Sequence, residues 1–152
     1  MKDCTDLTLV LADESRISDF VALEAANDAS GYIVPGAWDM HQLAMSQPDI
    51  HYFDIVVGGQ SEGFIIIAFE QNHSVELRRI VVKHKGQGIG QAALTSLENQ
   101  LFTSGTMRIW LDVFEDNARG RYIYQKLGFK AFGESTLQGK KLILMEKFAE
   151  LL

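Results

Sequence analysis

Short apolar segments separated by turn residues occupy most of this chain, and that pattern predicts β-strands. Each segment is rich in β-branched or aromatic residues and is bounded by residues that favour turns. We expect strands at residues 7–11, 51–57, 63–69, 75–82, 107–113, 129–132 and 141–145. Gly58-Gly59 is a strong signal for a hairpin between the second and third of these segments. Residues 63–69 are almost wholly apolar, so we expect this strand to be buried on both faces.

Apolar residues spaced three or four apart predict helices between the strands. The predicted helices are one through Ile17, Phe20, Val21 and Leu23, one between Asp39 and Pro48, one at residues 91–100 and one at residues 118–127. Asp13 or Ser15 can cap the first helix, and Asp39 with Gln42 has the spacing of a capping box for the second. Between these two helices we expect a mobile loop at residues 31–36.

The composition is that of an ordinary globular protein. Of 152 residues, 47% are apolar and 22% are charged, which suits a single α+β domain over residues 1–152. No apolar stretch approaches the roughly 20 residues needed to cross a bilayer, and the N-terminus lacks the pattern of a signal peptide. The one cysteine, Cys4, fits a reducing compartment, so we expect a cytoplasmic protein, and the spacing of Cys and His predicts no metal site.

Charge divides the chain into two unlike halves. Residues 1–76 hold thirteen acidic and two basic residues, a net charge of −11, whereas residues 77–152 hold seven acidic and twelve basic residues, a net charge of +5. A basic half suits an anionic ligand and an acidic half suits a cationic one. The alternative is that surface charge drifts along the chain without function. The acidic total of −6 argues weakly against nucleic acid as the main partner.

The segment from Val75 to Leu94 joins a predicted strand to a predicted helix through a turn with three glycines, Gly86, Gly88 and Gly90. A turn of this kind places free backbone N–H groups at the positive end of a helix dipole, where phosphate and pyrophosphate bind. The turn lacks the Lys-Ser or Lys-Thr of a P-loop, and antiparallel hairpins instead of a βαβ unit precede it. The alternative is a tight connection that binds nothing.

A second motif is the segment LDVFEDNARGRYIYQKLGF, in which Asn117 can cap a helix and Gly128 can end it. Taken with KGQGIG in the glycine turn, it closely resembles the GNAT family of N-acetyltransferases. The family pattern is matched by Asn117, Tyr124, Lys126, Gly128 and Phe129. Gly120 stands where the family usually has alanine. Two further departures are Lys85, where the family has arginine or glutamine, and a turn between Val82 and Gly88 that is shorter than the family's common form. Lysine keeps the charge but loses the fork of a guanidinium group.

The resemblance implies a fold and a cofactor. The family fold is a central, mostly antiparallel, twisted sheet of about six to seven strands, with a parallel splayed central pair and about four flanking helices. The cofactor is acetyl-CoA, whose pyrophosphate binds the glycine turn and whose pantetheine pairs with the preceding strand. The residues expected to bind it are Ile80, Val81, Val82, Lys85, Gly86, Gln87, Gly88, Ile89, Gly90, Asn117 and Lys126. For Lys126, as for Arg119 and Arg121, the alternative is a solvated helix face.

Acetyl transfer from a thioester to an amine needs a base for the amine and an acid for the leaving thiol. The resemblance gives Tyr124 the role of general acid, with packing against the core as its alternative. Glu76, at the start of the strand beside the cofactor, is the candidate base, with an ion pair to Arg78 or Arg79 as its alternative. Weaker candidates for the base are the strand-end acids Glu70 and Asp112.

The predicted function is therefore acetyl-CoA-dependent N-acetylation of a primary amine by direct transfer. The acidic first half favours a small cationic amine or a basic peptide, through residues such as Asp28, Asp39, Asp49 and Asp54. The alternative is a non-catalytic acyl-CoA-binding or sensing module, which needs only the glycine turn and Asn117. A third, weaker interpretation is an enzyme for protein N-termini or charged tRNA. We expect no nucleic-acid or membrane partner and leave a homodimer open.

Overall fold

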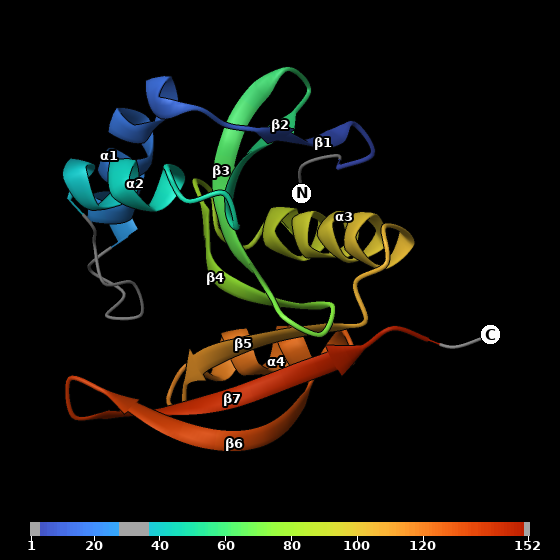
Figure 1. Ribbon diagram of the computed structural model, residues 1–152. Coiled ribbons are helices and arrows are strands. Elements are labelled where there is room, and N and C mark those ends of the chain that lie inside the picture. Colours follow the sequence, from blue (N-terminus) through green and yellow to red (C-terminus); the bar gives the residue numbers. More distant parts are fainter. Residues whose placement is uncertain (1–3, 28–36, 151–152) are drawn as a thin grey trace.

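The computed structural model describes residues 4–27 and 37–150, which form one seven-stranded sheet with helices on both faces (Figure 1). In chain order the elements are β1 (Leu7–Leu11), the 3₁₀ turn η1 (Glu14–Arg16), α1 (Ile17–Asn27), α2 (Trp38–Met45), β2 (Ile50–Val57), β3 (Gln60–Glu70), β4 (Ser74–Val82), α3 (Ile89–Thr103), β5 (Arg108–Phe114), α4 (Ala118–Lys126), β6 (Lys130–Leu137) and β7 (Lys140–Phe148). None of the described helices is long and apolar enough to cross a membrane. The loop predicted at residues 31–36 lies outside the described residues.

The strands lie in the order β1-β2-β3-β4-β5-β7-β6. β4 and β5 run parallel, and every other neighbouring pair in this sheet is antiparallel. Parallel neighbours need a crossover connection, and α3 provides it. The predicted mixed sheet, with a parallel central pair and four flanking α-helices, is therefore confirmed.

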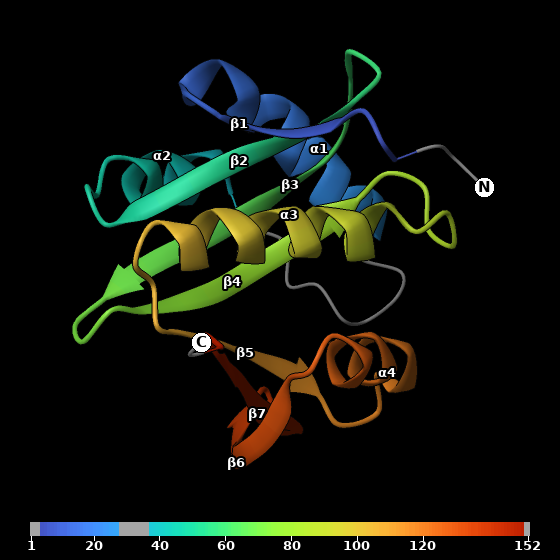
Figure 2. The same ribbon diagram turned by 90° about the vertical axis from the view of Figure 1, so that its right-hand side faces the viewer.

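The two parallel strands pair over a short distance only. Residues 74–76 of β4 lie opposite residues 108–110 of β5, and no further pairing joins these strands. Figure 2 shows them diverging toward the side where α4 lies. From Leu77 onward, one edge of β4 therefore has no neighbouring strand in the described part of the chain, although β3 still pairs with its other edge.

A bulge lies where β4 begins to diverge. Ile66 of β3 lies opposite Arg79, but the next residue, Ile67, lies opposite Leu77, so Arg78 has no partner of its own. A bulge of this kind bends its strand and increases the local twist. The bulge thus helps to turn the second half of β4 away from β5.

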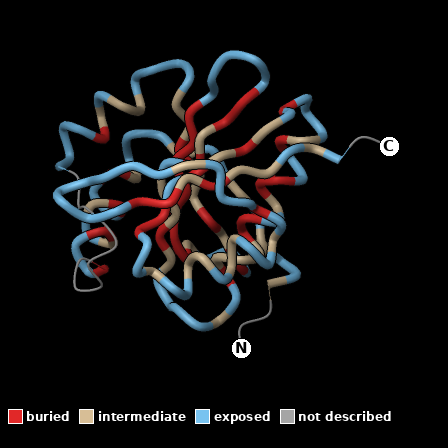
Figure 3. Tube along the Cα trace, turned by 90° about the horizontal axis from the view of Figure 1, so that it is seen from below, coloured by how far each residue is buried: buried red, intermediate tan, exposed pale blue. Residues whose placement is uncertain are grey.

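β3 contributes to both hydrophobic clusters of the core. Ile65 and Ile67 belong to the cluster that includes α3, whereas Phe64 belongs to the cluster that includes Phe20 of α1. Successive side chains of a strand point to opposite faces, so one strand supports both layers. The prediction that this strand is buried on both faces is confirmed, and Figure 3 shows the buried segments gathered in the middle of the fold.

Two predicted helix starts are wrong. α2 begins at Trp38, and its N-cap Ala37 makes no side-chain hydrogen bond, so Asp39 lies in the first turn and does not cap the helix. α3 begins at Ile89, earlier than the predicted residue 91, because Gly88 takes the left-handed conformation that precedes it. Both differences are shifts of a boundary, and the helices themselves are present.

The final hairpin is longer than predicted. β6 and β7 extend to a two-residue turn at Gln138 and Gly139, both of which have positive φ. Residues with side chains rarely adopt that conformation, so Gln138 provides no turn signal in the sequence. Most of β6 is exposed, which explains why its polar sequence lacks the apolar pattern of a buried strand.

Leu97 of α3 tests this description of the core, because its side chain is 1% exposed. Leu97→Ala should lower the free energy of unfolding by roughly 2–5 kcal/mol, since it removes buried carbon atoms and leaves a cavity. Urea unfolding followed by circular dichroism measures the change. Leu43→Ala in α2 is the matched control: Leu43 is 67% exposed, so its loss should change the free energy by less than about 0.5 kcal/mol. Equal losses in both variants would contradict this assignment of the core.

Candidate active site

An open cleft of about 390 Å³ lies where β4 and β5 diverge. Residues 77–80 of β4 and residues 111–114 of β5 form two of its walls, and α4 contributes a third. A smaller cavity of about 180 Å³ adjoins it along the glycine turn. The two share Ile80, Lys85 and Tyr124, among others, so they form one groove that runs from the glycine turn into the space between the strands.

The glycine turn closes one end of this groove. Gly86 and Gly88 have φ angles of 79° and 76°, a conformation in which a residue with a side chain would be strained. Gly88 is also the N-cap of α3. The first N–H groups of a helix have no partner within the helix, and they lie at the positive end of its dipole. The turn therefore offers backbone donors to an anion.

Most residues predicted to bind a cofactor line this groove. Those that line it are Ile80, Val82, Lys85, Gly86, Gly88, Ile89, Gly90 and Asn117. Val81, Gln87 and Lys126 do not, and the side chain of Val81 is buried on the α1 side of the sheet. The groove also includes residues that no sequence motif singled out, namely His84, Gln91, Leu94 and Ile123.

Asn117 is the N-cap of α4, as predicted. Its Oδ1 accepts a hydrogen bond from the backbone N–H of Gly120 at 3.0 Å. A Cβ atom at Gly120 would lie 2.7 Å from the amide nitrogen of Asn117, too close for an ordinary contact. Gly120, which stands where the family usually has alanine, therefore leaves room for the Asn117 side chain at the cleft.

Tyr124 lies on α4 and lines both parts of the groove. Its ring packs against the core and against the Phe129 ring, with 6.0 Å between the ring centroids. Burial, and to a smaller degree the negative charge of Asp112, raises the pKa of Tyr124 to about 12. The hydroxyl therefore keeps its proton at neutral pH and can donate it, or donate a hydrogen bond, to a group in the groove.

Asp112 lies on β5 across the cleft from β4. In the part of the chain that the structure describes, its carboxylate makes no hydrogen bond and no ion pair. The side chain is open to the cleft, yet desolvation by the surrounding walls raises its pKa, and attraction to Arg79 offsets part of this effect. A free carboxyl with a raised pKa beside a protonated phenol is a suitable arrangement for a base next to an acid.

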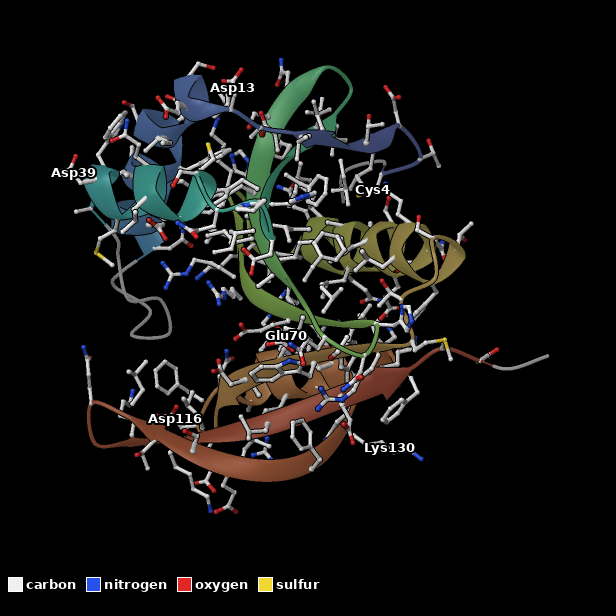
Figure 4. The ribbon with its side chains drawn as sticks, in the orientation of Figure 1. Cys4, Asp13, Asp39, Glu70, Asp116 and Lys130 are labelled. Atoms are coloured by element: carbon white, nitrogen blue, oxygen red, sulfur yellow. The ribbon has the colours of Figure 1, made fainter. Side chains whose placement is uncertain are left out.

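Glu76 and Glu70 lie outside the groove. Oε1 of Glu76 accepts a hydrogen bond from Nε of Arg78 at 2.8 Å, so the ion pair expected as its alternative is present. Glu70, labelled in Figure 4, accepts a hydrogen bond from the indole of Trp110 at 2.7 Å, near the end where β4 and β5 are paired. The structure therefore brings Tyr124 together with Asp112, and not with either of these glutamates.

Comparison with known proteins identifies the family of this fold. The model of the acetyltransferase (GNAT) family matches residues 17–129, which is more than half of the chain.

The chain belongs to the GNAT acetyltransferase family.

Similar GNAT proteins include a spermine/spermidine N(1)-acetyltransferase of Bacillus subtilis, which is 32% identical over 79 residues. That match covers 50% of this chain and 52% of the relative, so the chain spans about half the length of the curated relative it matches. A solved structure of spermidine N-acetyltransferase from Vibrio cholerae, in complex with CoA and spermine, has a TM-score of 0.82 at 17% identity and covers 95% of this chain and 96% of that one. The ribosomal-protein-S18-alanine N-acetyltransferase of Escherichia coli has a TM-score of 0.79 at 20% identity, with 96% of each chain covered. At these identities the two structures show the fold alone.

This GNAT fold also contains a buried polar network that the sequence did not predict. Glu24 of α1 is fully buried, and its Oε1 lies 2.6 Å from Nε2 of His41. Nδ1 of the same histidine lies 2.6 Å from the hydroxyl of Tyr52, and Arg79 donates a hydrogen bond to Oε2 of Glu24. Burial alone would raise the pKa of Glu24, but the hydrogen bonds from His41 and Arg79 outweigh it and lower the pKa. Because Arg79 lines the cleft, the network connects α1 and α2 to the groove.

Of the four acidic residues expected to attract a cationic acceptor, the three that the structure describes do not line the groove. Asp54 forms an ion pair with Arg16 at 3.0 Å, Asp49 is exposed in a turn, and Asp39 lies on the far side of α2 (Figure 4). Asp28 lies outside the described residues. Among those described, no group of three or more His, Cys, Asp or Glu residues could hold a metal ion.

The lowered pKa of Glu24 predicts a pH-dependent contribution to stability. Because the folded-state pKa lies below the ordinary value of 4.5, this contribution is present above that value and is lost as the pH falls through the folded-state pKa. Glu24→Gln should therefore lower the free energy of unfolding at pH 7, by roughly 3 kcal/mol, and the difference from the wild type should shrink on acidification. Urea unfolding at a series of pH values measures this difference.

Glu14→Gln is the control for this measurement, because Glu14 is an exposed carboxyl in η1. It should differ from the wild type by less than about 0.5 kcal/mol at each pH. A difference between Glu24→Gln and the wild type that stays constant or grows as the pH falls would show that the ionised network does not contribute in this way.

Proposed function

We propose that this protein is an acetyl-CoA-dependent N-acetyltransferase that transfers the acetyl group directly to a primary amine. The observation that carries the proposal is a protonated phenol, Tyr124, beside a free carboxyl, Asp112, in a cleft that continues to the glycine turn. Membership of the GNAT family supports this function. The name of the Bacillus subtilis relative, a spermine/spermidine N(1)-acetyltransferase, supports an amine as the acceptor.

In this proposal, acetyl-CoA lies along the groove. The glycine turn binds the pyrophosphate through its backbone N–H groups, and Lys85 and Arg119, which line both parts of the groove, add positive charge. The free edge of β4 at Ile80 and Val82 offers backbone groups that can form hydrogen bonds with the amides of the pantetheine arm. The arm would then pair with β4 as an added strand does. This orientation brings the thioester into the cleft between β4 and β5, close to Tyr124.

Two groups of the chain then move protons during the reaction. An alkyl amine with a pKa of about 10 enters mostly as the ammonium ion, and Asp112 accepts the first proton from it. The nitrogen forms a bond to the carbonyl carbon, and the carbon–sulfur bond breaks. Tyr124 donates a hydrogen bond and then its proton to the leaving sulfur, and the second proton from nitrogen restores the phenol through water. Asp112 then releases the first proton to the solvent. For each acetyl group transferred, the sulfur thus gains one proton and the solvent receives one.

Tyr124→Phe tests the role of the phenol. It should lower kcat by about 10²- to 10⁴-fold, because it removes the proton donor, and change the dissociation constant of CoA by less than about tenfold, because the ring still packs. Release of the CoA thiol across a panel of primary amines, followed with a chromogenic thiol reagent, measures turnover, and calorimetry measures CoA binding. Both measurements use the intact chain.

Tyr122→Phe is the matched control for Tyr124→Phe, since Tyr122 lies on the same helix and is 64% exposed. It should keep the wild-type kcat. An unchanged kcat in Tyr124→Phe would remove the general-acid assignment. Absence of thiol release with every amine would favour the non-catalytic acyl-CoA-binding module instead.

Comparison of Asp112→Asn with Glu76→Gln tests the identity of the base. Asp112→Asn should lower kcat/KM at pH 7 by about 10²-fold or more and remove the fall in activity that a carboxylate base predicts for the wild type on acidification. Glu76→Gln should cost less than about tenfold, because Glu76 pairs with Arg78 and does not line the cleft. The pH dependence of kcat/KM in each variant is the measurement. The opposite order of losses would return the role of base to Glu76.

A further inference from the structure

The cleft is basic, although the chain as a whole is acidic. Among the described residues that line it, Asp112 is the one acidic residue, whereas Arg78, Arg79, Lys85 and Arg119 are basic. Lys85 and Arg119 also line the cavity at the glycine turn, where the cofactor phosphates are proposed to bind. The charged residues that remain are Arg78, Arg79 and Asp112, which lie on the walls that enclose the proposed thioester position. An acceptor with several positive charges and no negative one fits this set poorly.

Arg79 is fixed more firmly than Arg78. The Arg78 side chain is 46% exposed, and its partner Glu76 lies outside the cleft. The Arg79 side chain is 25% exposed and donates a hydrogen bond to Glu24, a fully buried carboxylate that His41 contacts on its other oxygen. A guanidinium that is already ordered loses less entropy when it binds a ligand. Arg79 is therefore prepared to bind a group that enters the cleft.

Arg79 and Asp112 both retain capacity for a ligand. A guanidinium has five N–H donors, and among the described residues Arg79 uses Nη1 to donate to Glu24. The carboxylate of Asp112 has no partner in the same set of residues. The two groups lie on facing strands of the cleft, close enough for the charge of Arg79 to act on the Asp112 carboxyl. The cleft therefore presents a free carboxylate and a partly free guanidinium to the same molecule.

We propose that the acceptor is an amine with a carboxylate close to its amino nitrogen, as in an amino acid, and that Arg79 binds this carboxylate while Asp112 receives the ammonium group. The inference rests on the proposed acetyltransferase function and names its acceptor class. A guanidinium matches a carboxylate through parallel, charge-assisted hydrogen bonds. Binding at Arg79 then holds the amino nitrogen beside Asp112 and next to the thioester, which favours the reaction by orientation. A decarboxylated amine leaves Arg79 without an anion to bind.

The test compares amines that differ only in the carboxylate. The pairs are alanine and ethylamine, phenylalanine and 2-phenylethylamine, and lysine and 1,5-diaminopentane, with spermine as a further acceptor. In the wild type, kcat/KM for thiol release should be at least about tenfold higher for the amino acid of each pair, since a hydrogen bond to a charged group has about this effect. Arg79→Met should reduce this ratio by about tenfold or more. Comparing ratios between variants removes the difference in intrinsic reactivity between the two amines.

Two further variants make the test decisive. Arg79→Met leaves Glu24 without its partner and can destabilise the fold, so Arg79→Lys is measured alongside; it keeps the charge without the fork and should give an intermediate ratio. Arg78→Met is the matched control from the same strand and should keep most of the wild-type ratio. Loss of the ratio in Arg78→Met, with the ratio retained in both Arg79 variants, would overturn the assignment to Arg79.

The outcomes also separate this inference from the proposed function. Thiol release with ethylamine, 1,5-diaminopentane or spermine at equal or higher efficiency than with every amino acid would overturn the acceptor class and leave the acetyltransferase function intact. Absence of thiol release with every acceptor would overturn the function itself, and the acceptor class with it.

Discussion

The short parallel pairing of β4 with β5 is the constraint on which the site depends. Residues 74–76 and 108–110 hold the two strands together at one end, and the strands part beyond them. Full pairing would satisfy the backbone of both strands and leave no room for a ligand. Among the residues that the structure describes, no strand pairs with one edge of β4 beyond residue 76, although its other edge pairs with β3. Burying an unpaired backbone N–H or C=O group costs free energy. We therefore expect these groups to form hydrogen bonds with water or with a ligand.

The same divergence explains how residues from distant segments come to line one groove. α3 begins at Ile89, after the glycine turn that follows β4, and α4 begins at Ala118, after the short turn that follows β5. When the two strands part, the N-terminal ends of both helices lie beside the opening. Tyr124 and Leu127 of the α4 region pack against the core cluster that contains α3. Packing thus keeps the strands apart and sets the position of the phenol at the same time.

Local patterns in the sequence were sufficient for the elements and for the glycine turn, because alternation, spacing and caps are properties of neighbouring residues. The bulge at Arg78 left no such signal, since it is defined by the register against β3. The network of Glu24 was also hidden, because its partner Arg79 is 55 residues away along the chain. For the same reason the sequence ranked Glu76 above Asp112 as the base. Both are single acids in predicted strands, and only the arrangement of β4 and β5 decides which one lines the cleft.

The charge pattern of the chain shows why net charge along a sequence is a poor guide to the field of a site. The strongly acidic first half predicted a cationic acceptor, yet four of its thirteen acidic residues form ion pairs with arginines among the described residues. Asp54 pairs with Arg16, and Glu24, the most deeply buried of them, pairs with Arg79. A buried ion pair is weak evidence for stability, because well-packed apolar residues often serve as well. The position of Glu24 behind a cleft-lining arginine indicates a different role for its charge, which is to hold a guanidinium where a ligand can meet it.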